Sequence, residues 1–248
     1  MEYLAFGQMR GLKMAEFRAD RRQLIGAGVL VAGAGLAAAC SSGAKGSGTA
    51  AATWEPTAEN IDSWLDKPGT RHRMVFDSLT GEGGAEALDF ANNFIHVNES
   101  DYGLKPEQLG VVVILRHMST PFGYNQAVWA KYGKGFADKM KLTGDYAKTA
   151  ATTNPLLAAP AMLDTPPKGM EWINQNSLPD LASKGVRFAV CGLATKAIAG
   201  MVAGKTGNAD AIEAEFKSNL VPGALIVPAG ISALNRAQEH GYTLAYIG

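Results

Sequence analysis

Cysteine is scarce in this chain of 248 residues, which contains only Cys40 and Cys191. Cys40 lies in a stretch typical of a targeting signal, whereas Cys191 lies in a part patterned like a folded domain. Two cysteines placed in this way argue against a disulfide framework and do not have the spacing of a metal-binding knuckle. We therefore expect no disulfide, no metal site and no bound cofactor.

Net charge is also absent, because 23 basic residues balance 23 acidic ones. A chain without excess positive charge lacks the electrostatic footprint of a nucleic-acid-binding protein, so we expect no nucleic-acid partner. No internal repeat is visible. Two glycine-rich turns, residues 81–84 and 204–207, lack the spacing of a phosphate-binding loop and are interpreted as turns.

Long hydrophobic runs are missing too. The longest one, residues 24–39, is shorter than the roughly 20 residues that span a bilayer, which makes a permanent transmembrane helix the weaker interpretation. It follows Arg21 and Arg22 and resembles a twin-arginine export signal. We expect export by the twin-arginine pathway to the periplasm or its membrane.

The apolar run ends at Leu-Ala-Ala-Ala before Cys40, which resembles a lipobox. In that motif the cysteine becomes the lipidated first residue of the mature protein and anchors it to the membrane. Ordinary signal cleavage, leaving a soluble periplasmic protein, is the alternative. The sequence thus predicts a signal over residues 1–40, a flexible tether and lead-in over 41–70, and one domain over 71–248, whose folded part begins near Ile61 or Arg71.

Strand and helix patterns alternate through the domain. The second strand, residues 111–115, is apolar without alternation, as expected for a strand covered on both faces. Repeated β-α alternation predicts an α/β fold with a mostly parallel five-stranded sheet and helices on both of its faces. We expect strands at residues 73–76, 111–115, 186–191, 224–227 and 242–247, and helices at 85–97, 124–132, 174–183, 195–203, 209–217 and 232–240.

Residues 135–169 interrupt this alternation and contain four prolines. Long segments of this kind in compact domains are often lids or binding loops. A surface excursion or a contact between subunits is equally compatible with the pattern.

Cys191 is the leading candidate for chemistry. It is expected at the carboxyl end of the third strand, just before the Gly192 turn and the helix from Thr195. Ligands of parallel α/β sheets collect at this edge, and the following helix N-terminus, together with Lys196, favours a thiolate. The alternative is that Cys191 is a small buried hydrophobic residue.

His117 is expected at the corresponding end of the second strand. Consecutive strands are often neighbours in a sheet, so His117 and Cys191 form a candidate pair in which the imidazole assists thiolate formation or binds a carried sulfur. A role in capping the strand or bonding to the long loop is the alternative. The other three histidines are interpreted as surface residues.

Three blocks in order resemble the DsrE/DsrF-like family. They are LASKGVRFAVCG (residues 181–192), LVPGALIVPAGI (220–231) and AQEHGYTLAYI (237–247). The resemblance implies a three-layer α/β/α sandwich that assembles as a trimer or hexamer, with Cys191 as the residue that carries sulfur as a persulfide. His117 matches the histidine of a family His-Gly pair, but Met118 replaces the glycine.

These observations leave two functional hypotheses. The first is an exported sulfur-binding protein, a carrier rather than a turnover enzyme, in which Cys191 accepts sulfur from a protein or a small sulfur species and His117 assists. Its export signal excludes the cytoplasmic partners that relay members of the family serve. The second is a non-catalytic module that binds a small ligand at the strand ends under residues 135–169, or serves in oligomeric assembly. A metal-dependent or nucleotide-dependent enzyme is the weakest alternative.

Overall fold

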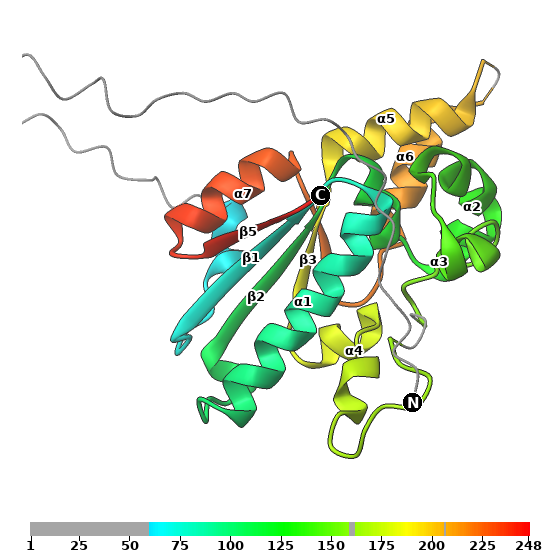
Figure 1. Ribbon diagram of the computed structural model, residues 1–248. Helices are drawn as coiled ribbons and strands as arrows, with labels where there is room; N and C mark the ends of the chain where they lie inside the picture. The colour runs from blue at the N-terminus through cyan, green and yellow to red at the C-terminus, as the bar shows by residue number, and fades with distance from the viewer. Residues whose placement is uncertain (1–59, 159–161, 206) are drawn as a thin grey trace, which may run out of the picture. The chain divides into compact units, whose positions relative to one another are not determined.

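The computed structural model describes residues 60–158, 162–205 and 207–248 (Figure 1). The predicted export signal, Cys40 and most of the predicted tether lie outside these residues. The chain divides into two units, residues 1–53 and 54–248, and the fold reported below is that of the second. None of the helices in the described part is long and apolar enough to cross a membrane.

Five parallel strands form the predicted sheet, in the order β4-β3-β2-β1-β5. The central strand β2 is buried along its whole length, which explains why its sequence does not alternate. This order places β2 directly beside β3, as expected for consecutive strands. The strands are β1 (His72–Ser78), β2 (Leu109–Leu115), β3 (Arg187–Cys191), β4 (Ala224–Val227) and β5 (Thr243–Ile247).

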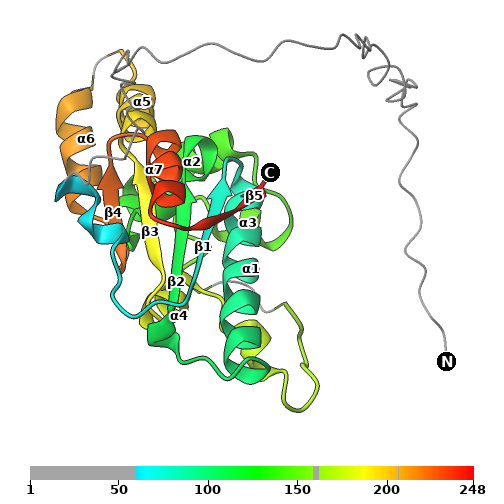
Figure 2. The same ribbon diagram turned by 90° about the vertical axis from the view of Figure 1, so that its left-hand side faces the viewer.

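Helices cover both faces, so the three-layer α/β/α architecture is confirmed (Figures 1 and 2). The α-helices of the described residues are α1 (Gly81–Ser100), α2 (Gln126–Met140), α3 (Gly144–Thr149), α4 (Leu178–Ser183), α5 (Gly192–Ala203), α6 (Ala209–Ser218) and α7 (Gly230–Glu239). Short 3-10 helices are η1 (Asn60–Leu65), η2 (Pro106–Gln108), η3 (His117–Gly123) and η4 (Glu171–Asn174).

The two faces carry separate hydrophobic cores of unequal size. Because side chains alternate along a strand, Phe76 and Val113 enter the larger core, and Val75 and Val112 enter the smaller one. The larger core is packed by α1, α2, α4, α5 and α6. The smaller core is covered by η1 and α7 alone among the described elements, and we call this side of the sheet the α7 face.

The first turn of α1 occupies the glycine-rich segment that the sequence predicts as a turn. Thr80 caps the helix, because its Oγ1 accepts the Gly83 N–H at 2.9 Å. A Cβ at Gly84 would lie 2.8 Å from the Phe122 ring, so glycine permits close packing of α1 on η3. The helix therefore begins four residues earlier than predicted, at Gly81.

The 3-10 helix η1 has no counterpart among the predicted elements. Its Leu65 is buried in the smaller core, and the Leu65 carbonyl accepts the Tyr242 hydroxyl at 3.0 Å. Asp62 of the same turn pairs with Arg236 of α7 at 3.4 Å. Of the two domain starts expected from the sequence, Ile61 is the closer one, and the lead-in after it is part of the fold.

The segment 135–169 contributes to the larger core rather than standing apart from it. Helix α2 continues to Met140, eight residues beyond its predicted end at Tyr132, and α3 follows. Leu156 is buried, and the Asn154 side-chain amide donates to the carbonyls of Phe122 and Tyr124, both at 2.9 Å. The described part of this segment thus packs on the side of the sheet opposite α7.

Candidate functional site

Cys191 ends β3 and caps α5. Its Sγ accepts the Ala194 N–H at 3.4 Å, in the position that a serine or aspartate oxygen takes at other helix starts. The Thr195 hydroxyl donates to the Cys191 carbonyl at 2.9 Å, and the Tyr124 hydroxyl donates to Thr195 at 2.9 Å. The predicted strand-to-helix junction is confirmed, and Cys191 as a residue is 7% exposed.

Gly192 lets α5 begin directly beside β4. A Cβ there would lie 2.9 Å from the Val227 carbonyl oxygen and 3.1 Å from that of Pro228. The Leu193 N–H donates to the same Pro228 carbonyl at 3.2 Å. Lys196 is exposed on α5, and none of the described hydrogen bonds links it to the thiol.

His117 follows β2 as the first residue of η3 and is exposed. Its backbone is left-handed, with φ of 55°, which is strained for a residue with a side chain. The turn is held because the N–H groups of Met118 and Ser119 both donate to the Leu79 carbonyl, at 2.8 and 3.2 Å. No described hydrogen bond joins the imidazole to Cys191, and their partnership stays a prediction.

Arg116 is the cation that the sheet register places next to Cys191. Leu115 pairs with Val190, so Arg116, the residue directly after β2, lies level with Cys191, the last residue of β3. Arg116 lies two positions after Ile114, and Cys191 lies two positions after Ala189. Ile114 and Ala189 belong to the smaller core, and side chains two positions apart on a strand share a face, so Arg116 and Cys191 both lie on the α7 face. The pKa of Arg116 is raised first by its hydrogen bonds to Asp77, and further by the nearby negative charges that Tyr246 and Cys191 carry when ionised.

Asp77 fixes the orientation of Arg116. The guanidinium Nε and Nη2 donate to the two carboxylate oxygens at 2.7 and 2.8 Å, and the carboxylate is 1% exposed. Gly230, at the start of α7, packs on the arginine stem, since a Cβ there would lie 2.6 Å from Arg116 Cβ. A bidentate pair of this kind holds a planar cation in one orientation.

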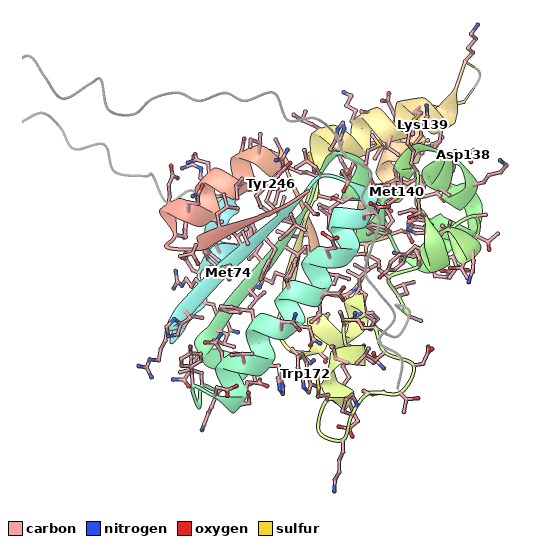
Figure 3. The ribbon with its side chains drawn as sticks, viewed as in Figure 1. Met74, Asp138, Lys139, Met140, Trp172 and Tyr246 are labelled. Carbon is pink, nitrogen blue, oxygen red and sulfur yellow. The ribbon has the colours of Figure 1, made fainter. Side chains whose placement is uncertain are left out.

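A row of functional groups therefore crosses four neighbouring strands at their carboxyl ends. Tyr246, labelled on β5 in Figure 3, pairs in register with Asp77 of β1. Arg116 and Cys191 continue the row. Asp77 and Arg116 are not among the site residues predicted from the sequence. Each directly follows a predicted strand and could have been noticed for that reason. That the two side chains form a pair depends on the order of the strands and on the face of the sheet to which each side chain points.

The β1–α1 turn is occupied by the chain itself. The Gly248 backbone oxygen accepts the N–H groups of Leu79 and Thr80 at 3.3 and 3.1 Å, and the Thr80 hydroxyl at 3.0 Å. Gly83 has no side chain that would collide with this oxygen. The segment 81–84 is thus the first turn of α1 rather than the turn predicted from the sequence, and the Gly248 carbonyl packs against it.

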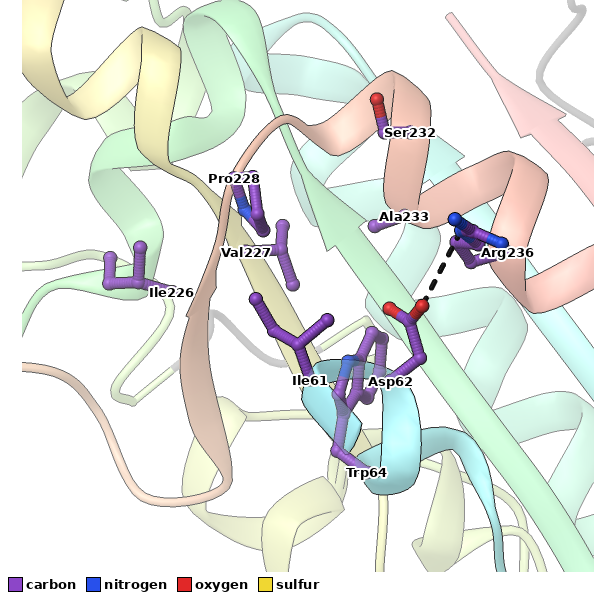
Figure 4. A pocket seen from close by; sticks show the side chains of 9 residues that line it. All are labelled: Ile61, Asp62, Trp64, Ile226, Val227, Pro228, Ser232, Ala233 and Arg236. Carbon is purple, nitrogen blue, oxygen red and sulfur yellow. Dashed lines mark ion pairs between the residues drawn. The ribbon is translucent and has the colours of Figure 1, made fainter. Parts of the chain in front are cut away.

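A cavity of about 180 Å³ lies on the α7 face beside the edge strand β4 (Figure 4). Val227, the register partner of Cys191, belongs to its wall. None of the described residues of the segment 135–169 lines it, although the sequence suggested that this segment covers the strand ends. Among the described residues, no group of three or more histidine, cysteine, aspartate or glutamate side chains is placed to hold a metal ion.

Comparisons of the chain with protein-family models, with curated proteins and with solved structures find no match. The DsrE/DsrF-like resemblance thus rests on its three sequence blocks. In the fold these blocks form β3 with the start of α5, β4 with the start of α7, and the end of α7 with β5.

Proposed function

We propose that this protein is an exported sulfur carrier that holds a transferable sulfur atom on Cys191 as a persulfide. The observation that carries the proposal is the placement of the Cys191 thiol, which caps α5 and has the Arg116 cation beside it on the next strand. A sulfur carrier needs a sulfur that is stable as an anion before and after loading. Helix N–H groups and a neighbouring guanidinium both favour negative charge on sulfur.

The transfer step is redox-neutral. The Cys191 thiolate attacks the outer sulfur of a donor persulfide or polysulfide, forming a new S–S bond while the donor S–S bond breaks and its thiolate leaves with the electron pair. Arg116 stabilises the negative outer sulfur of the product, and Asp77 keeps the guanidinium oriented. His117, exposed at the same edge of the sheet, is proposed to handle the proton of the incoming donor.

Location and assembly complete the proposal. The sequence around Arg21 and Arg22 supports export, and Cys40 supports a lipid anchor. The family resemblance supports a trimer or hexamer that exchanges sulfur with a donor and an acceptor. The predicted carrier would not turn over a substrate by itself.

A second candidate is a non-catalytic module that binds a small ligand. The low exposure of Cys191 and the separate cavity beside β4 favour it. In that case the thiol acts as a helix cap and fills space at the sheet edge.

Mass spectrometry of the mature protein from its own envelope tests the first proposal. After exposure to polysulfide, we expect the Cys191 peptide to gain the mass of one sulfur atom, to lose it on reduction, and to remain unmodified in Cys191→Ser. Circular dichroism of Cys191→Ser controls for the fold. A native thiol that gains no sulfur from polysulfide or from thiosulfate would contradict the carrier proposal and favour the second candidate.

A further inference from the structure

The cavity beside β4 lies apart from the groups that the sulfur proposal uses. It is lined by side chains from η1, β4 with the residue after it, and α7 (Figure 4). We propose that it binds a small uncharged compound with a single aromatic ring. This inference rests on the second candidate function and is independent of chemistry at Cys191. The lining residues are Ile61, Asp62, Trp64, Ile226, Val227, Pro228, Ser232, Ala233 and Arg236.

The size of the cavity sets the size of the ligand. A dry protein cavity of about 150 Å³ is known to take up benzene. The cavity beside β4 measures about 180 Å³, which is enough for one substituted ring.

Its walls are mostly apolar and contain one aromatic face. Val227 and Ala233 belong to the smaller core, and Ile61 lies at the solvent side with 62% of its surface exposed. Trp64 adds an indole ring, against which an aromatic ligand can stack at a gain beyond its buried area. A ring ligand is therefore favoured over a flexible chain of the same volume.

The charges of the lining cancel. Asp62 and Arg236 are its two charged residues, and they pair with each other at 3.4 Å. Arg236 also reaches Glu239 at 3.2 Å, so the guanidinium is already matched by carboxylates. A charged ligand would lose its hydration without an unpaired partner to replace it, and an uncharged ligand avoids this cost.

Two hydrogen-bond donors of the lining remain for a polar substituent. The indole N–H of half-buried Trp64 and the hydroxyl of exposed Ser232 take part in none of the hydrogen bonds described. A ring with a hydroxyl or carbonyl oxygen could accept from either of them. Phenol is the simplest compound with all of these properties and is the probe of choice.

We would titrate phenol into the mature Cys191→Ser protein and follow binding by ligand-observed NMR. A ligand of this size is expected to bind with a Kd on the order of 1 mM. Ile61→Ala removes part of the wall and should weaken binding by about threefold to tenfold. Ile231→Ala is the matched control, because it is the same change on α7, at 58% exposure and outside the cavity, and should leave the Kd unchanged.

Charged analogues test the argument from charge. Benzoate and benzylammonium should bind at least about tenfold more weakly than phenol. Equal binding of either ion, equal effects of the two isoleucine variants, or no saturable phenol binding would each overturn the proposal. Sulfur loading of Cys191 in the wild-type protein is a separate readout, so failure of this site and failure of the carrier function are distinguishable.

Discussion

Arg116 links stability and proposed function at the scale of one residue. Arg116→Gln would leave the buried Asp77 carboxylate without its ion-pair partner, and we expect a loss of about 3 kcal/mol in the free energy of unfolding, measured with urea. It should also shorten the lifetime of a persulfide on Cys191. Arg116→Lys keeps the charge without the bidentate geometry, and its free energy of unfolding and persulfide lifetime should lie between those of the wild type and of Arg116→Gln.

The double variant Asp77→Asn/Arg116→Gln separates these roles. It removes both charges, so it should regain most of the stability that Arg116→Gln loses. It should not regain the retention of sulfur on Cys191. If the double variant retains sulfur as long as the wild type does, Arg116 acts only as the partner of Asp77.

Tyr124 provides a second prediction at this scale. Burial raises the pKa of its phenol well above the ordinary value of 10.0, so the folded protein keeps the proton that the unfolded chain releases. The contribution of Tyr124 to stability is therefore constant below about pH 9 and falls as the pH rises through about 10. Tyr124→Phe should flatten this fall and should cost about 1 kcal/mol at neutral pH through the lost bond to Thr195.

Urea unfolding at a series of alkaline pH values measures this slope. Tyr102→Phe is the matched control, because Tyr102 is exposed and should leave the slope unchanged. A Tyr124→Phe protein with the wild-type slope would show that another group causes the alkaline loss.

At the scale of elements, the start of α5 packs closely against the end of β4 at Gly192. Gly192→Ala would force a methyl group against the Val227 and Pro228 carbonyls, and we expect a loss of about 1–3 kcal/mol in thermal or urea unfolding. Gly200→Ala lies in the same helix with open space around it and should be neutral or stabilising by about 0.5–1 kcal/mol. Equal effects of the two changes would contradict the close approach of α5 and β4.

The contact between α1 and the segment before α4 depends on Asp89 and Asn176. The Asn176 amide donates to the Asp89 carboxylate, while its own buried oxygen has no partner among the described residues. Burial is the main cause that raises the pKa of Asp89, against the effect of this hydrogen bond. The folded protein thus binds a proton more tightly than the unfolded chain does, and stability declines as the pH rises above about 4.

Asp89→Asn removes this decline. We expect the variant to unfold at higher urea concentration than the wild type near neutral pH, with a smaller difference near pH 4. Glu107→Gln is the control, because it also replaces a carboxylate by an amide but lies outside the Asp89–Asn176 contact. Its effect on urea unfolding should not differ between the two pH values. A variant destabilised equally at both pH values would mean that the carboxylate is better solvated than its burial suggests.

Some elements of the fold could be predicted from the sequence, and others could not. Apolar patterning predicted all five strands, because β2 and β3 are buried on both faces and leave an unbroken apolar signal. It missed η1, a 3-10 helix too short for a periodic pattern, whose Leu65 is buried against the sheet. Cys191 was predicted from its place after a strand, whereas Arg116 gains its role from the register of β2 with β3, which no local pattern contains.

At the scale of the whole molecule, the predicted lipid anchor is separable from the fold. Cys40 lies outside the described domain, so Cys40→Ser should move the protein from the membrane to the soluble fraction of the envelope without changing its unfolding midpoint. Fractionation with immunoblotting measures the first effect. Retention in the membrane fraction would point to another means of attachment.

The position of β5 has a consequence for how the protein is made. Strand β1 is nearly the first element of the domain, yet one of its edges is completed only by β5, and the Thr80–Gly248 contact that fastens this edge spans 168 residues. While the ribosome is still translating, β1 therefore presents an unpaired backbone edge, which is a site for aggregation. Synthesis of this sheet is complete only when β5 has emerged beside the strand with which the sheet began, and until then this edge of β1 stays open.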